Sequence, residues 1–116
     1  MSDEEILAEL KKITKLLMFA YSDDIKIELE KVATTPQRKM IWALLDGKHM
    51  SNEIAQKIKI STRAVNLFLD KAEMLGLAKN PRNEPPYRLI DYVPPEWVDL
   101  IPVEEKELKG EEVQNE

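Results

Sequence analysis

Apolar residues recur at helical spacing near the start of the chain. Between Asp3 and Tyr21 they follow one another at steps of four and three residues, which places them on one stripe of a helix. This stripe is made of Ile6, Leu10, Ile13, Leu17 and Ala20. This stripe is expected to pack against other apolar side chains, either in the core of the same chain or on the matching helix of a second copy. Heptad-like steps favour helix pairing. We interpret residues 1–35 as an N-terminal helical segment for dimerisation. The residues expected at the dimer seam are Ile6, Leu10, Ile13 and Leu17.

A polar break follows this stripe. Residues 22–24, with the sequence SDD, prefer caps and turns, and helical spacing resumes over residues 25–32. Two interpretations stay open: a bend between two helices, or a polar patch within one long helix.

A second helix is expected to begin at Thr35 and Pro36. Thr35 is a suitable N-cap, and the fixed backbone angle of Pro36 suits the first helical position. The pattern predicts that this helix runs to Asp46, with Gly47 as its stop. Trp42 lies away from the centre of its apolar face, so we expect Trp42 to contribute to a helix contact.

Two further helices follow, joined by a tight turn. Ser51 is expected to cap a helix over residues 51–58, and Ser61 to cap a helix over residues 62–75, which ends before Gly76. From their spacing, the side chains expected to face the core in the three helices after residue 35 are Met40, Ile41, Leu44, Leu45, Ile54, Ala55, Ile58, Val65, Phe68, Leu69, Ala72 and Leu75.

Two short strands are expected after Gly76, over residues 77–79 and 87–90. The loop between them, NPRNEPP, is too irregular for a two-residue hairpin turn. Met50 is a candidate for one further strand-like pairing residue. Residues 91–101 predict an extended segment held by Trp97, Val98 and Ile101. Residues 102–116 are charged and poor in core residues, which predicts an acidic disordered tail.

The distribution of charge changes what the composition implies. The formal net charge of −5 argues against nucleic acid, because contacts with phosphate dominate that kind of affinity. The charge is unevenly spread, however: residues 1–35 carry −3, residues 36–90 carry +5 and residues 91–116 carry −7. Positive charge is therefore gathered on the predicted helix pair and strands.

The sequence lacks the residues that several classes of function require. The chain has no cysteine and one histidine, His49, so no metal site is predicted. No carboxylate is matched with a nucleophile motif or a glycine-rich phosphate loop, so we expect no cofactor and no enzyme activity. The acidic start MSDEEI and the lack of any apolar run near the roughly 20 residues of a membrane span predict a cytoplasmic protein without a membrane partner.

The helix pair carries a recognisable sequence pattern. Residues 53–65, EIAQKIKISTRAV, resemble the "EIA..L.IS..TV" pattern of winged helix-turn-helix transcription regulators. Residues 69–78, LDKAEMLGLA, resemble the "L..LE..GL" that ends the recognition helix of that family. The span from about Pro36 to Ile90, about half of the chain, matches the family order of three helices and a wing. It looks most like the small MarR-like and ArsR-like regulators.

This resemblance implies a fold that is mainly α with a small β-wing, a winged helix-turn-helix at residues 36–101 with an added N-terminal helix. It implies a transcriptional regulator that binds double-stranded DNA as a homodimer, with recognition helix 62–75 in the major groove and wing 79–88 on the backbone. By the same resemblance, Arg63 suits guanine or phosphate, Asn66 suits adenine, and the serine and threonine hydroxyls suit phosphate oxygens. The DNA-binding residues that it implies are Ser51, Lys59, Ser61, Thr62, Arg63, Asn66, Lys79, Arg82 and Arg88.

Two departures from the family pattern bear on the function. Lys59 stands where the turn is often glycine, so either the turn forms without a permissive backbone or Lys59 adopts an uncommon conformation. Leu67 and Asp70 lie on the outer face of the recognition helix, where regulators often have polar or basic residues. The alternative function is a protein-interaction module, with exposed Leu67, Trp42 and Trp97 contacting a larger assembly.

Overall fold

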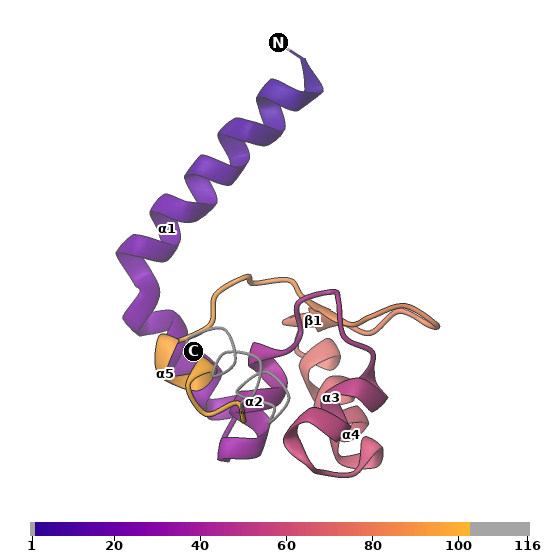
Figure 1. Cartoon of the computed structure of the whole chain (residues 1–116). Helices are drawn as coiled ribbons and strands as arrows, with labels where there is room; N and C mark the ends of the chain where they lie inside the picture. The colour runs from indigo at the N-terminus through magenta and orange to yellow at the C-terminus, as the bar shows by residue number, and fades with distance from the viewer. Residues whose placement is uncertain (1, 103–116) are drawn as a thin grey trace, which may run out of the picture. The chain divides into compact units, whose positions relative to one another are not determined.

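The computed structural model describes residues 2–102, and the predicted tail from residue 103 onward lies outside them. This described part of the chain is mainly helical with one small antiparallel sheet (Figure 1). Its elements are α1 (Asp3–Val32), α2 (Pro36–Ala43), α3 (Ser51–Ile58), α4 (Thr62–Met74), β1 (Ala78–Lys79), β2 (Tyr87–Arg88) and α5 (Pro95–Val98). Contacts between residues divide the chain after Val32 into two units, of which the second begins at Ala33. Within residues 2–102, no helix combines the length and the apolar character needed to cross a membrane.

The first unit is the long helix α1. Its first turn is capped by Ser2, whose Oγ accepts a hydrogen bond of 3.2 Å from the backbone N–H of Glu5. The backbone leaves helical angles at Tyr21, with φ −120° and ψ 19°. The polar residues 22–24 therefore follow a real kink, which decides between the two interpretations of this break. The buried residues of α1 are Leu29 and Val32.

Helix α2 begins as predicted but ends earlier. Oγ1 of Thr35 accepts a hydrogen bond of 3.2 Å from the backbone N–H of Arg38, and Pro36 occupies the first turn. The prediction that the helix continues to Asp46 was wrong, because α2 ends at Ala43. After that point the chain turns to pair with β2: the carbonyl of Leu45 accepts from the N–H of Arg88 at 3.0 Å.

Helices α3 and α4 pack against each other and are joined by a three-residue turn. The cap of α3 is Met50, not the predicted Ser51, and the carboxylate of Glu53 accepts from the N–H of Met50 at 2.8 Å. Lys59 makes the turn in the left-handed region, with φ 59° and ψ 47°. Ser61 caps α4 as predicted, because its Oγ accepts from the N–H of Ala64 at 3.1 Å.

The small sheet follows α4 in sequence, and its first strand contacts α4. Strands β1 and β2 are antiparallel, with Ala78 opposite Arg88 and Lys79 opposite Tyr87. The extra pairing residue is Asp46, which bridges to Tyr87, so the prediction of Met50 in that role was wrong. Gly47, with φ +78°, belongs to this turn rather than to the end of α2, and its N–H donates to the carbonyl of Pro86 at 3.1 Å.

The core of the second unit comes from all of its helices. Most of the predicted core positions are buried, namely Ile41, Leu44, Leu45, Ile54, Ala55, Ile58, Val65, Phe68, Leu69 and Ala72. The prediction for Leu75 was wrong, since Leu75 caps the end of α4 and stays 53% exposed, and Met40 is only half-buried.

Both tryptophans belong to this core. Trp42 and Trp97 are each 1% exposed, so the alternative interpretation, in which both are exposed and contact a larger assembly, was wrong about these two residues. Nε1 of Trp42 donates a hydrogen bond of 2.9 Å to the carbonyl of Tyr92. Residues 91–101 are not extended throughout as predicted, because Pro95 starts the short helix α5, which carries Trp97 into the core and leaves Val98 half exposed.

Candidate nucleic-acid interface

A polar groove lies where the start of α3, the middle of α4 and the β1–β2 loop meet. It has a volume of about 420 Å³. Its lining residues are Met50, Ser51, Asn66, Asn80, Pro81, Arg82, Asn83, Glu84 and Pro86. Three of the predicted contact residues, Ser51, Asn66 and Arg82, are brought together here although they come from three separate elements. We call this surface the α3–α4–loop groove.

The chain fixes the loop side of this groove by backbone contacts. The N–H of Asn80 donates a hydrogen bond of 2.8 Å to Oε2 of Glu73, which ties the start of the loop to α4. Asn83 adopts φ +63°, a left-handed conformation that asparagine tolerates better than most residues. The far end of the loop is held by the contact of Pro86 with Gly47. Arg82 therefore projects from a loop anchored at both ends.

The first turn of α4 presents the second part of the candidate interface. Ser61, Thr62 and Arg63 are exposed there, and Asn66 is half-buried one turn further along. The Oγ of Ser61 is used as the helix cap, but its hydroxyl hydrogen remains able to donate to an anion. Lys59, in the turn just before, is exposed as well, and so is Lys79 on β1.

Arg88 does not join this surface, which corrects its predicted role. Its side chain is 10% exposed. Nη1 of Arg88 donates to the carbonyl oxygens of Trp42 at 2.8 Å and Ala43 at 3.1 Å, and Nη2 lies 3.0 Å from Oδ1 of Asp91. The guanidinium therefore caps the end of α2, where the last carbonyls have no partner within the helix. Arg88 is a structural residue.

Four acidic side chains lie near the interface, and two of them have defined hydrogen-bond partners. Glu53 and Glu73 accept hydrogen bonds from backbone N–H groups. Glu84 lines the α3–α4–loop groove, and Asp70 is exposed further along α4. Residues 36–90 keep a net positive charge with these acidic side chains included, and two of the acids are engaged in structural hydrogen bonds.

Asp46 holds the turn beneath the hairpin. Nδ1 of His49 lies 3.0 Å from both carboxylate oxygens of Asp46, and the backbone N–H of Lys48 donates to Oδ1 at 2.8 Å. Partial burial acts to raise the pKa of Asp46, but the hydrogen bonds from His49 and Lys48 outweigh it and leave this pKa below the ordinary 3.8. The ionised carboxylate thus helps to order the segment that bridges to Tyr87.

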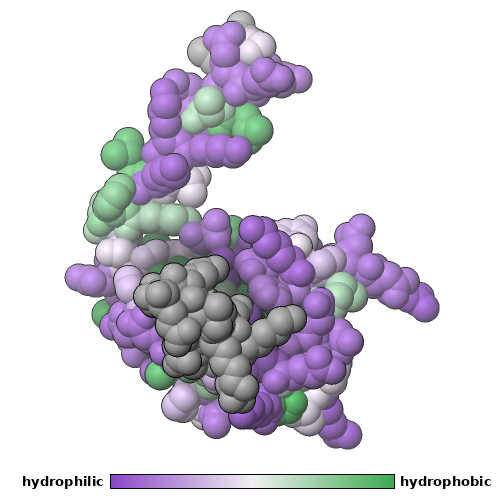
Figure 2. Space-filling view, viewed as in Figure 1, coloured by the Kyte–Doolittle hydropathy of each residue, from purple (hydrophilic) through white to green (hydrophobic). Residues whose placement is uncertain are grey.

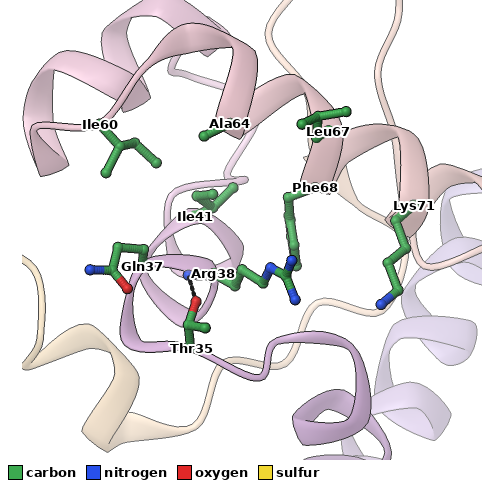
Figure 3. Close-up of a pocket in the computed structure, with 9 residues that line it drawn as sticks. All are labelled: Thr35, Gln37, Arg38, Ile41, Ile60, Ala64, Leu67, Phe68 and Lys71. Atoms are coloured by element: carbon green, nitrogen blue, oxygen red, sulfur yellow. Dashed lines mark hydrogen bonds between the residues drawn. The ribbon is translucent and has the colours of Figure 1, made fainter.

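A second groove lies between α2 and α4, with a volume of about 310 Å³. Figure 3 shows Gln37 and Arg38 on α2 facing Ala64 and Leu67 on α4 across this space. The full lining is Thr35, Gln37, Arg38, Ile41, Ile60, Ala64, Leu67, Phe68 and Lys71. We call it the α2–α4 groove. It combines an apolar floor with the cationic side chains of Arg38 and Lys71.

Sequence reasoning missed this second groove and the two cations on it. The spacing of Ala64, Leu67 and Lys71 at steps of three and four places them on one face of α4, so part of the pattern was readable. The position of α2 against that face could not be predicted from the sequence pattern.

Comparisons with models of protein families, with curated proteins and with solved structures found no match.

Eight of the nine predicted contact residues are available at the surface. Lys59, Ser61, Thr62, Arg63, Lys79 and Arg82 are exposed, and Ser51 and Asn66 are half-buried. Among residues 2–102, no group of three or more His, Asp or Glu side chains is arranged to hold a metal ion. The arrangement that the surface offers is a polar and cationic one, suited to hydrogen bonding with an anionic polymer.

Proposed function

We propose that this protein is a cytoplasmic transcriptional regulator that binds duplex DNA through a winged helix-turn-helix. The observation that carries the proposal is the α3–α4–loop groove, in which Ser51, Asn66 and Arg82 meet. A hydroxyl, an amide and a guanidinium from three elements form a combination that suits a phosphate backbone next to a base edge.

The order of the elements supports this proposal. Helix α2, the bridging residue Asp46, helices α3 and α4 and then the β1–β2 hairpin follow one another as helix, strand, two helices and two strands do in a winged helix. In this assignment α4 is the recognition helix, α3 braces it across the backbone, and residues 79–88 are the wing.

The chemistry of the exposed side chains defines their proposed roles. Arg63, in the first turn of α4, reaches guanine or a phosphate, and Asn66 pairs with an adenine edge. Lys59 and Arg82 contact phosphates on either side of the recognition helix, and the hydroxyls of Ser51, Ser61 and Thr62 donate to phosphate oxygens. Arg88 has no part in binding, because it holds the end of α2.

Regulators of this kind bind as two-fold dimers, and we assign dimerisation to α1. Two recognition helices would then meet successive major grooves about 34 Å apart. The apolar stripe of α1 supports this assignment, since its side chains are exposed in the single chain.

A charge-reversal pair tests the proposal. The variant Arg63→Glu with Arg82→Glu changes two exposed cations of the candidate interface, and Arg38→Glu with Lys71→Glu makes the same change of charge on the α2–α4 groove. Binding of a labelled duplex is measured by fluorescence anisotropy at about 150 mM salt, where charges farther apart than about 8 Å are largely screened. We expect the first variant to lose about 100-fold or more in affinity, and the second to lose much less. Equal losses in both variants would contradict the assigned interface.

The α2–α4 groove favours a second candidate function, that of a protein-interaction module. Leu67 is 59% exposed at this groove, beside Ile41, which is buried at its floor. A large apolar side chain on a helix next to two cations suits a partner segment that is apolar and acidic. In that case the Arg38→Glu, Lys71→Glu variant loses its partner, whereas the Arg63→Glu, Arg82→Glu variant keeps it.

A further inference from the structure

We propose that two copies of this chain pair through α1 in antiparallel orientation, with Ile6 opposite Leu17 and Leu10 opposite Ile13 of the second copy. The proposal deepens the dimer assigned above and rests on it. It adds the orientation of the two helices and the register of the contact.

The contact surface is the apolar stripe of α1 before its kink. The stripe side chains are 42% (Ile6), 54% (Leu10), 52% (Ile13) and 53% (Leu17) exposed. Leu7 and Leu16 flank the stripe and are 52% and 67% exposed. Figure 2 shows apolar side chains among hydrophilic ones along this helix. An exposed stripe of this length on a single helix is a protein-contact surface.

The spacing of the stripe fits an antiparallel partner. Its four large side chains, Ile6, Leu10, Ile13 and Leu17, follow one another at steps of four, three and four residues, so their spacing reads the same in both directions, with the midpoint between Lys11 and Lys12. A two-fold axis at that midpoint places an isoleucine of one copy against a leucine of the other in every layer. In a parallel pair, layers of two isoleucines would alternate with layers of two leucines.

The identity of the stripe residues also disfavours the parallel pair. In heptad terms the leucines occupy the a positions and the isoleucines the d positions. Parallel two-stranded coiled coils favour the reverse, and leucine at a with isoleucine at d shifts parallel coils to higher oligomers. The layers of the antiparallel pair each combine one leucine with one isoleucine, so this unfavourable arrangement does not arise.

Charge along α1 points to the same orientation. The segment 3–9 carries four acidic and no basic side chains, and the segment 11–15 carries three lysines and no acidic ones. A parallel pair would set the two acidic segments side by side. Asp3, three residues before Ile6, lies in line with the stripe, and an antiparallel pair places it opposite Ala20 of the second copy and not opposite a second Asp3. Separating these like charges favours the antiparallel orientation.

The kink defines where this pairing ends. Helical backbone angles break at Tyr21. The straight segment before it is 18 residues, from Asp3 to Ala20, which corresponds to about 27 Å of helix. All four layers lie inside this segment. Ala20 ends the stripe within this segment, and the heptad position after it, Asp24, is acidic and lies beyond the kink.

Cysteine cross-linking tests the orientation directly, because the sequence contains no cysteine. Three single variants are made: Ile6→Cys, Leu17→Cys and, as a matched control on the opposite face of the helix, Ala8→Cys. Each is oxidised alone, and Ile6→Cys is also oxidised in an equimolar mixture with Leu17→Cys. In the antiparallel pair, residue 6 of one copy is about 16 Å along the axis from residue 6 of the other, and the same holds for residue 17, which is too far for a disulfide.

We expect the mixture to yield a disulfide-linked heterodimer at least about tenfold above either single variant alone and above the control. Homodimers of Ile6→Cys alone, formed as readily as the mixture forms heterodimers, would overturn the orientation in favour of a parallel pair. No cross-link above the control, together with a monomer mass for the unmodified chain by light scattering, would overturn pairing through α1 altogether. The experiment contains no DNA, so a failure of DNA binding leaves its result unchanged.

Discussion

The guanidinium of Arg88 lies 2.8 Å from the carbonyl oxygen of Trp42, and this contact joins the second strand of the hairpin to the end of α2. The Arg88 side chain is only 10% exposed, so its guanidinium has little contact with solvent. Two residues that are 46 positions apart in sequence are thus joined, and the guanidinium is a second donor to the Trp42 carbonyl, which also accepts from the N–H of Leu45 at 3.2 Å.

Arg88 and Arg82 are therefore expected to respond in opposite ways to substitution. Arg88→Ala leaves two carbonyls of α2 without their charged donor and should lower the free energy of unfolding by about 1–3 kcal/mol. Arg82→Ala, on the exposed loop, should leave stability within about 0.5 kcal/mol of the parent and weaken DNA binding instead. Urea unfolding and duplex titration of the two variants distinguish these outcomes. A stable Arg88→Ala variant with lost DNA binding would return Arg88 to the interface.

Two leucines on α4 make a second matched pair. Leu69 is fully buried and Leu67 is 59% exposed. Leu69→Ala should lower the free energy of unfolding by about 2–5 kcal/mol, because it leaves a cavity in the core. Leu67→Ala should change it by less than about 0.5 kcal/mol. Comparable losses in urea unfolding would mean that the outer face of α4 is covered within the folded chain.

Substitutions of Lys59 are expected to change both the stability of the fold and the affinity for DNA. Its left-handed backbone angles cost about 1 kcal/mol in any residue with a Cβ. Lys59→Gly should therefore raise the free energy of unfolding by up to about 1 kcal/mol, whereas Lys59→Ala keeps the strained backbone. Both substitutions remove the ammonium group, so both should weaken DNA binding alike. If only Lys59→Ala weakened binding, the ammonium group would not be a phosphate contact.

Several features of this molecule were readable from the sequence for physical reasons. Periodicity identified the buried faces of α3 and α4, since residues such as Ile54 and Leu69 repeat at helical spacing. Ser61 was recognised as a cap because its position precedes an apolar pattern. Because Lys59 stands where the family often has glycine, an uncommon backbone conformation at Lys59 was one of two possibilities, and the structure has this conformation.

Other features depend on contacts between distant residues, which local patterns do not carry. The end of α2 at Ala43 is set by Arg88 and by pairing of Leu45 with β2. The side chain of Arg88 resembled an exposed wing cation in sequence, and only the position of α2 turns it inward. Trp42 and Trp97 are buried for the same kind of reason, because α5 folds back onto α2.

The pKa of Asp46 predicts a dependence of stability on pH. This pKa lies below 3.8 in the folded chain, so the folded state favours the ionised form. The resulting stability is present above pH 3.8 and is lost as the pH falls through the folded pKa. Urea unfolding of the parent and of Asp46→Asn should therefore differ at neutral pH and converge in acid. The exposed Asp70→Asn serves as the control, and a difference that persisted in acid would argue against the charge of Asp46 as its cause.

Binding of duplex DNA as a function of salt tests the central claim most directly. Each phosphate neutralised contributes about −0.9 to the slope of log affinity against log salt concentration. Lys59, Arg63, Lys79 and Arg82 supply four exposed cations per copy, so a dimer should show a slope of about −5 to −7 between about 50 and 200 mM salt. A slope near zero, or no binding to duplexes even at the lowest salt concentration, would contradict the assignment of this surface to DNA.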